Sequence, residues 1–474
     1  MMILGTEEKI IKKEWKKWIQ LLLYPQLHGI GGIGIVRMSG ENCFDILNKI
    51  FKAKNEQNID EIKGYTIKYG HIFDEQKNIV DEVLISYFKA PKSYTTENMC
   101  EINTHGGIII LRKILELCLK NGADLAEPGE FTKRAFLNGR IDLLQAESVI
   151  DVINAKSDKE AKASINQLEG KLSKKINEIK QKILDVMVNV EVAIDYPEYD
   201  VEDATNDEVL TMLNSVECDL KALEKSFDNG KIIKEGIKTA IIGKPNAGKS
   251  SLLNAILDEE RAIVTDIEGT TRDTIEEFVT INGIPLNIID TAGIRETENE
   301  VEKIGVVKSK KIAEEADLII AIFDASKQLT EEDLEILNII KGKKTIIVLN
   351  KMDLENQINE DNEKIKEVSN YIIKISALKK EGIEELYNKI SEMFNLNQIN
   401  VDNEIVITNL RHKSLISNAI NNVNEARKTL QNGMPSDIVA IYIKNILESL
   451  GEITGEEVTE NIINEIFSKF CLGK

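Results

Sequence analysis

One glycine-rich segment of the sequence carries the residue types that bind phosphate groups. The segment Gly243–Ser250 (GKPNAGKS) follows a short apolar run, Thr239–Ile242, and precedes a helix-like run, Ser251–Leu257. In a strand–loop–helix context the GxxxxGK[ST] pattern is typical of a phosphate-binding loop (P-loop), because its backbone N–H groups converge on phosphate oxygens. We expect Lys249 to reach the β- and γ-phosphates of a nucleotide and Ser250 to bind Mg²⁺.

Three more segments complete a guanine-nucleotide site, and each follows a predicted strand. Asp290–Gly293 (DTAG) supplies a carboxylate for the Mg²⁺ shell and a backbone N–H for the γ-phosphate. Asn350–Asp353 (NKMD) contributes Asp353, which can accept both N–H groups on the base edge of guanine, whereas adenine lacks that pair of donors. Ser376 and Ala377 end another strand, where backbone N–H groups can donate to guanine O6. Parallel strands bring such segments together at one edge of a sheet, so the sequence predicts a guanine-specific P-loop GTPase.

The segment between the P-loop and the DTAG motif contains Glu268–Asp273 (EGTTRD), in which Thr270 or Thr271 would complete the Mg²⁺ shell. Ile294 follows the DTAG motif, where Ras-type GTPases carry a water-orienting glutamine. An aliphatic side chain cannot orient water, so we expect a downstream acidic residue to do so, although a solvated acidic loop is the alternative. The candidates, among which the pattern does not choose, are Glu296, Glu298, Glu300 and Glu302.

The composition limits the classes to which the protein can belong. Its 474 residues correspond to about three domains. Lys+Arg 60 against Asp+Glu 80 gives a net charge of -20, so the chain is a poor bulk binder of nucleic acid unless a small basic patch or a basic partner supplies the contact. The five cysteines form no CxxC pair, which indicates reduced thiols in a cytosolic protein. No apolar run approaches the roughly 18 residues that a membrane-spanning helix needs.

Periodicity predicts how the chain is organised. Residues 29–132 alternate short strands with a helix, Gly107–Leu119, and indicate a small α/β domain. Long amphipathic helices follow, and then a linker at Gly230–Gly236. A parallel sheet with crossover helices continues to Phe394, and Val401–Lys474 is helical again.

The first residues fit none of these domains. Lys9–Leu22 places both tryptophans of the protein on one apolar helical face beside several lysines. A helix on a membrane surface is one interpretation. We instead interpret residues 1–28 as an atypical leader without function. The segment also lacks the features of a signal peptide.

Taken together, these motifs and the two ends of the chain resemble the tRNA-modification GTPase MnmE (TrmE) family over about residues 31–474. A generic GTPase would share only the nucleotide motifs, so the segments outside them are the stronger evidence. Met1–His28 does not match the short strand with which the family begins. The matching segments are Gly31–Gly40 (GGIGIVRMSG), Glu101–Gly107 (EINTHGG), Pro128–Asn138 (PGEFTKRAFLN), Asn246–Ser250, Gly269–Asp273 and Phe470–Lys474 (FCLGK).

The resemblance implies a fold that combines the α/β and all-α classes. Residues 29–132 would form a folate-binding and dimerisation domain. Residues 133–235 and 396–474 would be the two parts of one helical domain. Residues 236–395 would be an inserted P-loop GTPase domain with a mostly parallel, doubly wound sheet.

The resemblance also implies the activity and its partners. Members of the family form homodimers through the N-terminal domains and a heterotetramer with MnmG, a flavin- and NADH-dependent protein. Together the two proteins install a carboxymethylaminomethyl or aminomethyl group at C5 of the wobble uridine of certain tRNAs, which bind mainly through the partner. The implied cofactors are GTP, Mg²⁺, K⁺ and a tetrahydrofolate that carries a one-carbon unit. The expected location is the cytoplasm, without stable membrane association.

Individual positions of the family fall on residues of this chain. The folate contacts correspond to Arg37, Glu101, Arg140 and Lys474. The water-orienting carboxylate corresponds to Glu302, and a C-terminal cysteine of uncertain chemical role to Cys471. The potassium site corresponds to Asn246 with groups around Thr265, Ile267 and Thr270, and we assign Mg²⁺ to Ser250 and Thr271. The remaining expected nucleotide contacts are Ala247, Gly248, Lys249, Ser251, Asp266, Glu268, Gly269, Asp290, Thr291, Ala292, Gly293, Asn350, Lys351, Met352, Asp353, Ser376, Ala377 and Leu378.

Two other functions stay open at this point. One is a GTP-controlled ribosome or RNA assembly factor without one-carbon chemistry, although such factors usually add a basic domain that the C-terminal helices do not provide. The other is a membrane-associated GTPase, which only Lys9–Leu22 supports. Folate binding by the N-terminal region would separate the tRNA-modifying enzyme from both.

Overall fold

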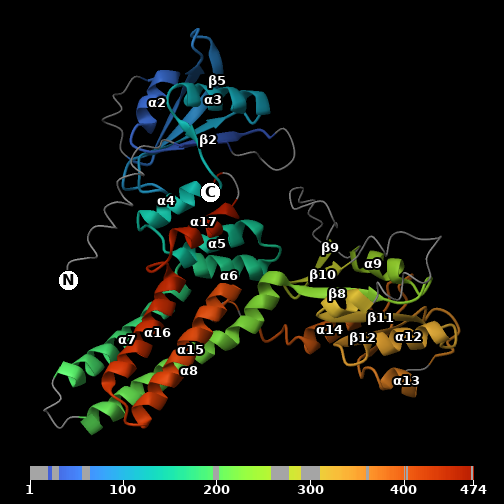
Figure 1. Cartoon of the computed structure of the whole chain (residues 1–474). Coiled ribbons are helices and arrows are strands. Elements are labelled where there is room, and N and C mark those ends of the chain that lie inside the picture. Colours follow the sequence, from blue (N-terminus) through green and yellow to red (C-terminus); the bar gives the residue numbers. More distant parts are fainter. Residues whose placement is uncertain are drawn as a thin grey trace. The chain divides into compact units, whose positions relative to one another are not determined.

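The computed structural model describes residues 20–23, 31–55, 64–195, 202–257, 277–289, 310–358, 362–399, 401, 404–470 and 473 (Figure 1). The chain divides into two compact units. The first comprises Met1–Ile153, Gln167–Asn177 and Glu448–Lys474, and the second comprises Asn154–Asn166 and Glu178–Leu447.

A seven-stranded sheet with the order β3-β4-β5-β6-β2-β1-β7 forms the N-terminal part of the first unit. Its strands are β1 (Gln20–Leu23), β2 (Gly34–Ser39), β3 (Phe51–Ala53), β4 (Thr66–Phe73), β5 (Ile79–Phe88), β6 (Met99–Thr104) and β7 (Asp124–Leu125). All neighbours are antiparallel except β1 and β7. Helices α2 (Cys43–Ile50) and α3 (Ile108–Lys120) lie against the sheet (Figure 1). Leu47 and Ile114 from these helices share one core with Val36, Ile85 and Ile102 from the strands.

Strand β1 corrects the interpretation of the first residues. An atypical leader without function was expected over residues 1–28, and these residues did not match the short strand with which the family begins. Instead, Gln20–Leu23 pairs with β2, with Leu22 opposite Arg37, and with β7 on its other side. A short helix without tertiary packing is marginal in water, whereas a strand between two others has its backbone groups paired on both sides. The remainder of residues 1–30 lies outside the described part of the chain.

Helices complete the first unit. They include α4 (Glu130–Leu137), α5 (Leu143–Asn154) and α17 (Glu460–Ser468). Leu143 and Ala146 of α5 share a core with Phe467 and Phe470 near the C-terminus. Gly129, which precedes α4, has a φ of 72°, and a Cβ there would lie 2.7 Å from the Phe467 carbonyl oxygen. The C-terminal helix therefore packs onto the helices that follow the N-terminal sheet.

The other long helices are α6 (Asp158–Leu168), α7 (Lys171–Asp195), α8 (Glu202–Glu235), α15 (Leu410–Gln431) and α16 (Ser436–Thr454). Helices α6, α7 and α16 contribute residues to both units, whereas α8 and α15 belong wholly to the second unit. Two helical segments far apart in sequence meet here, because Arg427 of α15 forms an ion pair of 2.5 Å with Glu217 of α8. Ile416 and Val423 line the buried face of α15, as periodicity predicted. No helix among the described residues is long and apolar enough to cross a membrane.

A six-stranded sheet with the order β13-β12-β11-β8-β10-β9 forms the rest of the second unit, and only β9 is antiparallel. Its strands are β8 (Ile237–Ile242), β9 (Glu277–Ile281), β10 (Ile284–Ile289), β11 (Leu318–Asp324), β12 (Thr345–Asn350) and β13 (Ile372–Lys374). Its helices include α9 (Lys249–Leu257), α12 (Glu331–Ile340), α13 (Glu363–Lys366) and α14 (Ile383–Met393). Ile320 and Ile322 of β11 pack in the core with α9 and α14, whereas Ile319 and Phe323 pack with α12 and α13. Helices thus cover both faces, which confirms the predicted doubly wound, mostly parallel sheet.

The linker predicted at Gly230–Gly236 is wrong. Helix α8 continues without interruption to Glu235, and Gly236, with a φ of 71°, follows it. A Cβ at Gly230 would lie 2.0 Å from the carbonyl oxygen of Ile407, so glycine permits a second chain segment to approach the helix closely. The Ile407 N–H also donates to Ser226 Oγ at 3.1 Å. Glycine here serves packing rather than chain flexibility.

Candidate functional site

The P-loop lies between β8 and α9, as its motif predicts. Asn246 has a φ of 62° and Gly248 a φ of 105°. A Cβ at Gly248 would lie 2.0 Å from Asn350 Nδ2, so only glycine fits there. Lys249 Nζ donates to the carbonyl oxygens of Gly243 at 2.8 Å and Lys244 at 3.0 Å. Burial lowers the pKa of Lys249, and its ammonium group lies within the loop.

Asn350 joins three of the predicted segments. Its side chain is buried, donates from Nδ2 to the Ala247 carbonyl at 2.9 Å, and accepts at Oδ1 from the Ala377 N–H at 3.0 Å. The P-loop, the NKMD motif and the loop after β13 therefore meet at one buried amide. Because an unsatisfied buried polar group is costly, this contact also fixes the spacing of the three loops.

The predicted base-recognition residues lie together beside this amide. Ser376 Oγ donates to Asp353 Oδ1 at 2.6 Å, and this hydrogen bond lowers the pKa of Asp353. The group is therefore a carboxylate at neutral pH, with acceptor capacity for two N–H donors. Leu378 is exposed, and the Met352 N–H donates to the Ile375 carbonyl at 3.1 Å.

Lys351 is held by a nearly buried carboxylate. It has a φ of 67°, and its Nζ lies 2.7 Å from Asp324 Oδ2. Burial acts to raise the pKa of Asp324, but hydrogen bonds from Lys351 and Ser326 outweigh it and hold that pKa below its usual value. This ion pair fixes the stem of Lys351 at the edge of the base site.

A second lysine of the P-loop forms an ion pair that was not predicted. Lys244 Nζ lies 2.7 Å from Asp333 Oδ2, and Asp333 is buried. Asp333 also accepts from the Thr330 N–H in a capping box that begins α12. The Thr-x-x-Asp spacing was the available signal, since an acidic residue three positions after an N-cap is typical of such a box.

Many of the predicted nucleotide contacts lie outside the described residues. They are Thr265, Asp266, Ile267, Glu268, Gly269, Thr270, Thr271, Asp290, Thr291, Ala292, Gly293 and the candidate acidic residue Glu302. Ser250 and Ser251 are described and lie in the first turn of α9.

A second site lies in the first unit. A pocket of about 500 Å³ opens beside β2, β5 and β6, and its lining includes Arg37, Glu101 and Arg140, which are three of the predicted folate contacts. Segments that are distant in sequence thus bring these residues together around one cavity. Its volume falls in the usual range for small-molecule sites.

Arg37 and Glu101 form the centre of this pocket. They lie opposite each other on β2 and β6. Arg37 Nε and Nη2 donate to Glu101 Oε1 at 2.8 and 2.6 Å, and Nη1 donates to the Gly473 carbonyl at 3.1 Å. The C-terminal tail therefore reaches the pocket at Gly473, whereas its neighbours Cys471 and Lys474 lie outside the described residues.

Arg140 lies at another part of the wall. Its guanidinium carbon is 4.8 Å from the centre of the Tyr94 ring, and Nη1 donates to the Tyr94 carbonyl at 3.2 Å. Burial raises the pKa of Tyr94, so its hydroxyl, 2.9 Å from Thr132 Oγ1, stays protonated. A carboxylate acceptor, an aromatic ring and two arginines suit a flat heterocycle that carries carboxylate groups.

No cluster of His, Cys, Asp and Glu able to hold a metal ion occurs in the part of the chain that the structure describes. The described cysteines Cys43, Cys100, Cys118 and Cys218 are free thiols.

The fold and the contacts around Lys249 and Asn350 define a guanine-type P-loop GTPase. Residues 26–140 match the family described as GTP-binding protein TrmE N-terminus, and residues 143–471 match the MnmE helical domain. The chain is 51% identical over 450 residues to the tRNA modification GTPase MnmE of Acetivibrio thermocellus, covering 94% of this chain and 97% of that protein. It is 53% identical over 446 residues to the protein of the same name from Clostridioides difficile, with the same coverage. The chain belongs to the MnmE (TrmE) family of tRNA modification GTPases.

Replacing Asn350 with alanine tests the contact that joins the three loops. The change leaves the Ala247 carbonyl and the Ala377 N–H without their partner, so the free energy of unfolding should fall by about 2 kcal/mol. Urea denaturation followed by circular dichroism measures the change. Asn356→Ala, at an exposed position in the following loop, is the matched control and should have little effect. Equal stability of the two variants would contradict a joining role for Asn350.

Proposed function

We propose that this protein hydrolyses GTP and, with an MnmG-type flavoprotein, installs a carboxymethylaminomethyl or aminomethyl group at C5 of the wobble uridine of certain tRNAs. The observation that carries the proposal is the presence in one chain of two sites, the guanine site around Asn350 and the pocket around the Arg37–Glu101 pair. An assembly GTPase needs only the first. We further propose that the protein acts in the cytoplasm as a homodimer joined through its N-terminal domains.

The described part of the guanine site supports a division of labour for GTP hydrolysis. Lys249 would stabilise charge on the β- and γ-phosphates, and Asp353 would select guanine. The Ser250 hydroxyl at the start of α9 suits a Mg²⁺ ligand, with Thr271 as the proposed second ligand. Mg²⁺ would neutralise phosphate charge when bound. Glu302 is the proposed water-orienting residue.

The pocket supports binding of a reduced folate. The carboxylate of Glu101 can accept hydrogen bonds from the amino edge of the pterin, and the guanidinium groups of Arg37 and Arg140 can pair with carboxylates. Lys474 would add a further cation, since Gly473 already contacts Arg37. The folate would supply the one-carbon unit, and Cys471 remains a candidate for a role in its transfer.

Nucleoside analysis of bulk tRNA tests the proposed function. Deleting the gene should remove the modified wobble uridine, and the intact chain should restore it. Chains with Glu101→Gln or Asp353→Asn should each fail to restore it, because the two sites serve one reaction. Unaltered modification together with defective ribosomal particles would favour the assembly factor and contradict the proposal.

Asp353→Asn tests base recognition separately. A neutral amide cannot accept both guanine N–H groups, so GDP affinity should fall by more than about tenfold, equivalent to 1.5–3 kcal/mol. The affinity for xanthosine diphosphate should fall less or even rise, because the new amide N–H can donate to the 2-oxo group of xanthine. Equilibrium titration measures both, with Glu355→Gln on the adjacent exposed loop as control. Unchanged GDP affinity would refute the role of Asp353.

A potassium requirement should appear in the hydrolysis rate. Ras-type enzymes receive positive charge at the β–γ bridging oxygen from an arginine finger worth roughly 10³–10⁵ in rate. Here the exposed Asn246 of the P-loop, with groups around Thr265, Ile267 and Thr270, would hold K⁺ as the positive centre. Hydrolysis should be fast in KCl and slow in NaCl, and Asn246→Ala should lose that difference.

Asn254→Ala, at an exposed position on α9, provides the control and should keep the potassium response. Steady-state phosphate release at matched ionic strength measures all three proteins. Equal rates of the unmodified protein in KCl and NaCl would overturn the potassium site.

A further inference from the structure

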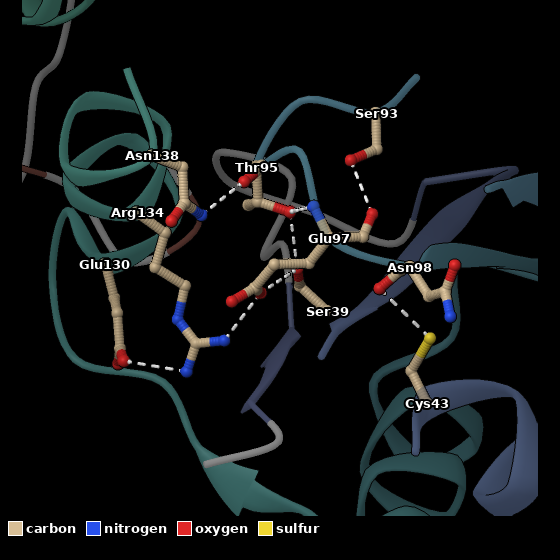
Figure 2. A network of polar contacts seen from close by, with 9 residues as sticks. All are labelled: Ser39, Cys43, Ser93, Thr95, Glu97, Asn98, Glu130, Arg134 and Asn138. Carbon is tan, nitrogen blue, oxygen red and sulfur yellow. Dashed lines mark hydrogen bonds and ion pairs between the residues drawn. The ribbon is translucent and has the colours of Figure 1, made fainter. Parts of the chain in front are cut away.

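One wall of the folate pocket is held in part by side chains that do not line it. Ser93, Tyr94 and Thr96 line the pocket. Behind them, Arg134 of α4 donates from Nη1 to Glu97 Oε2 at 2.7 Å and from Nη2 to Glu130 Oε1 at 3.3 Å (Figure 2). The Arg134 side chain is only 7% exposed.

The same carboxylate oxygen of Glu97 is anchored from the sheet. Ser39 Oγ, at the end of β2, donates to Glu97 Oε2 at 2.8 Å and lies 2.6 Å from Thr95 Oγ1. Ser39 and Thr95 are fully buried. The segment 93–98 (the pocket-wall segment) is therefore fixed between a helix and a strand, with the Glu97 carboxylate as their common point (Figure 2).

Hydrogen bonds to the backbone complete the restraint. Asn138 Nδ2 donates to the Thr95 carbonyl at 2.7 Å, and Ser93 Oγ donates to the Glu97 carbonyl at 2.6 Å. Between them, Thr96 has a φ of 62°, which β-branched residues rarely adopt. Such a conformation persists only where surrounding contacts over-determine it. The shape of the pocket wall thus depends on the network behind it.

Charge makes Arg134 the critical member of this network. Its guanidinium lies between the carboxylates of Glu97 and Glu130, and the Glu130 side chain is 5% exposed. Burial raises the pKa of Glu130, while the Glu127 N–H donates to its Oε2 at 2.9 Å. Removing the cation would leave the buried carboxylate of Glu130 and the partly exposed carboxylate of Glu97 without the charge that both contact, which destabilises the arrangement.

We propose that Arg134 is a positioning residue for the folate pocket: it holds the pocket-wall segment, including Thr96, in the conformation that binds ligand. The inference rests on the proposed folate site but concerns a residue that lies behind the pocket lining. Arg134 acts through Glu97 and needs no contact with the ligand.

Titration calorimetry with tetrahydrofolate under anaerobic conditions tests the proposal on the full chain. Arg134→Gln should weaken binding by about tenfold, the scale of the single charge-assisted hydrogen bond to Glu97 that holds the pocket-wall segment. Arg134→Lys should give an intermediate affinity, because lysine keeps the charge but loses the forked geometry. Arg427→Gln, which removes the ion pair to Glu217 on α8, is the matched control and should not change folate affinity.

A second readout follows the segment itself. Lys92 is exposed and precedes the pocket-wall segment, so trypsin cleavage after it reports local opening. Cleavage there should be faster in Arg134→Gln than in the unmodified chain or in Arg427→Gln. If Arg134→Gln does not fold, as judged by circular dichroism, Glu97→Gln replaces it, because that change keeps the side-chain shape while removing the charge that Arg134 contacts.

The outcomes separate this inference from the proposed function. One outcome overturns the positioning role. In it, the unmodified chain binds tetrahydrofolate and Glu101→Gln weakens that binding, but Arg134→Gln neither weakens binding nor speeds cleavage after Lys92. If the unmodified chain fails to bind tetrahydrofolate, the folate function is contradicted. Faster cleavage after Lys92 in Arg134→Gln would then still support the conclusion that Arg134 restrains the pocket-wall segment.

Discussion

The close approach of Ile407 to Gly230 determines how the nucleotide-binding sheet is inserted into the helical part of the second unit. A side chain at Gly230 would overlap the Ile407 carbonyl, and Ser226 fixes the adjacent N–H. The chain therefore leaves α8 at Gly236 and returns beside that helix before α15 begins at Leu410. The six-stranded sheet therefore lies between α8 and α15 along the chain, while Arg427 of α15 and Glu217 of α8 still form their ion pair.

Each candidate site depends on its own polar side chain, which joins segments from distant parts of the sequence. Asn350 connects the P-loop with the loop after β13, and Glu97 connects α4 with β2 through Arg134 and Ser39. In each case the joining group is buried or half-buried and uses the same side chain for several hydrogen bonds. Such a group sets the loop geometry because breaking one contact leaves polar atoms without partners in a region of low water access.

Features set by a short stretch of sequence could be predicted from that stretch alone. The P-loop, the NKMD motif and the strands before them follow from spacing and hydrophobic runs, and in the structure Asn350 contacts both Ala247 of the P-loop and Ala377 after β13. Contacts over long sequence distances escaped prediction. Gly230 was interpreted as part of a linker because the sequence does not distinguish a glycine needed for packing from a glycine in a flexible loop. Strand β1 depends on neighbours at β2 and β7, and Arg134 acquires its role only when α4 meets residues 93–98.

The proposed function requires two separate ligand sites in one chain, one for a guanine nucleotide and one for a reduced folate. Titration of the full chain with tetrahydrofolate, first alone and then with saturating GDP, measures whether the two sites are separate. Each ligand should bind in the presence of the other, and Glu101→Gln should weaken only the binding of folate. Displacement of tetrahydrofolate by GDP, or loss of both ligands in Glu101→Gln, would show that the chain does not carry two separate sites.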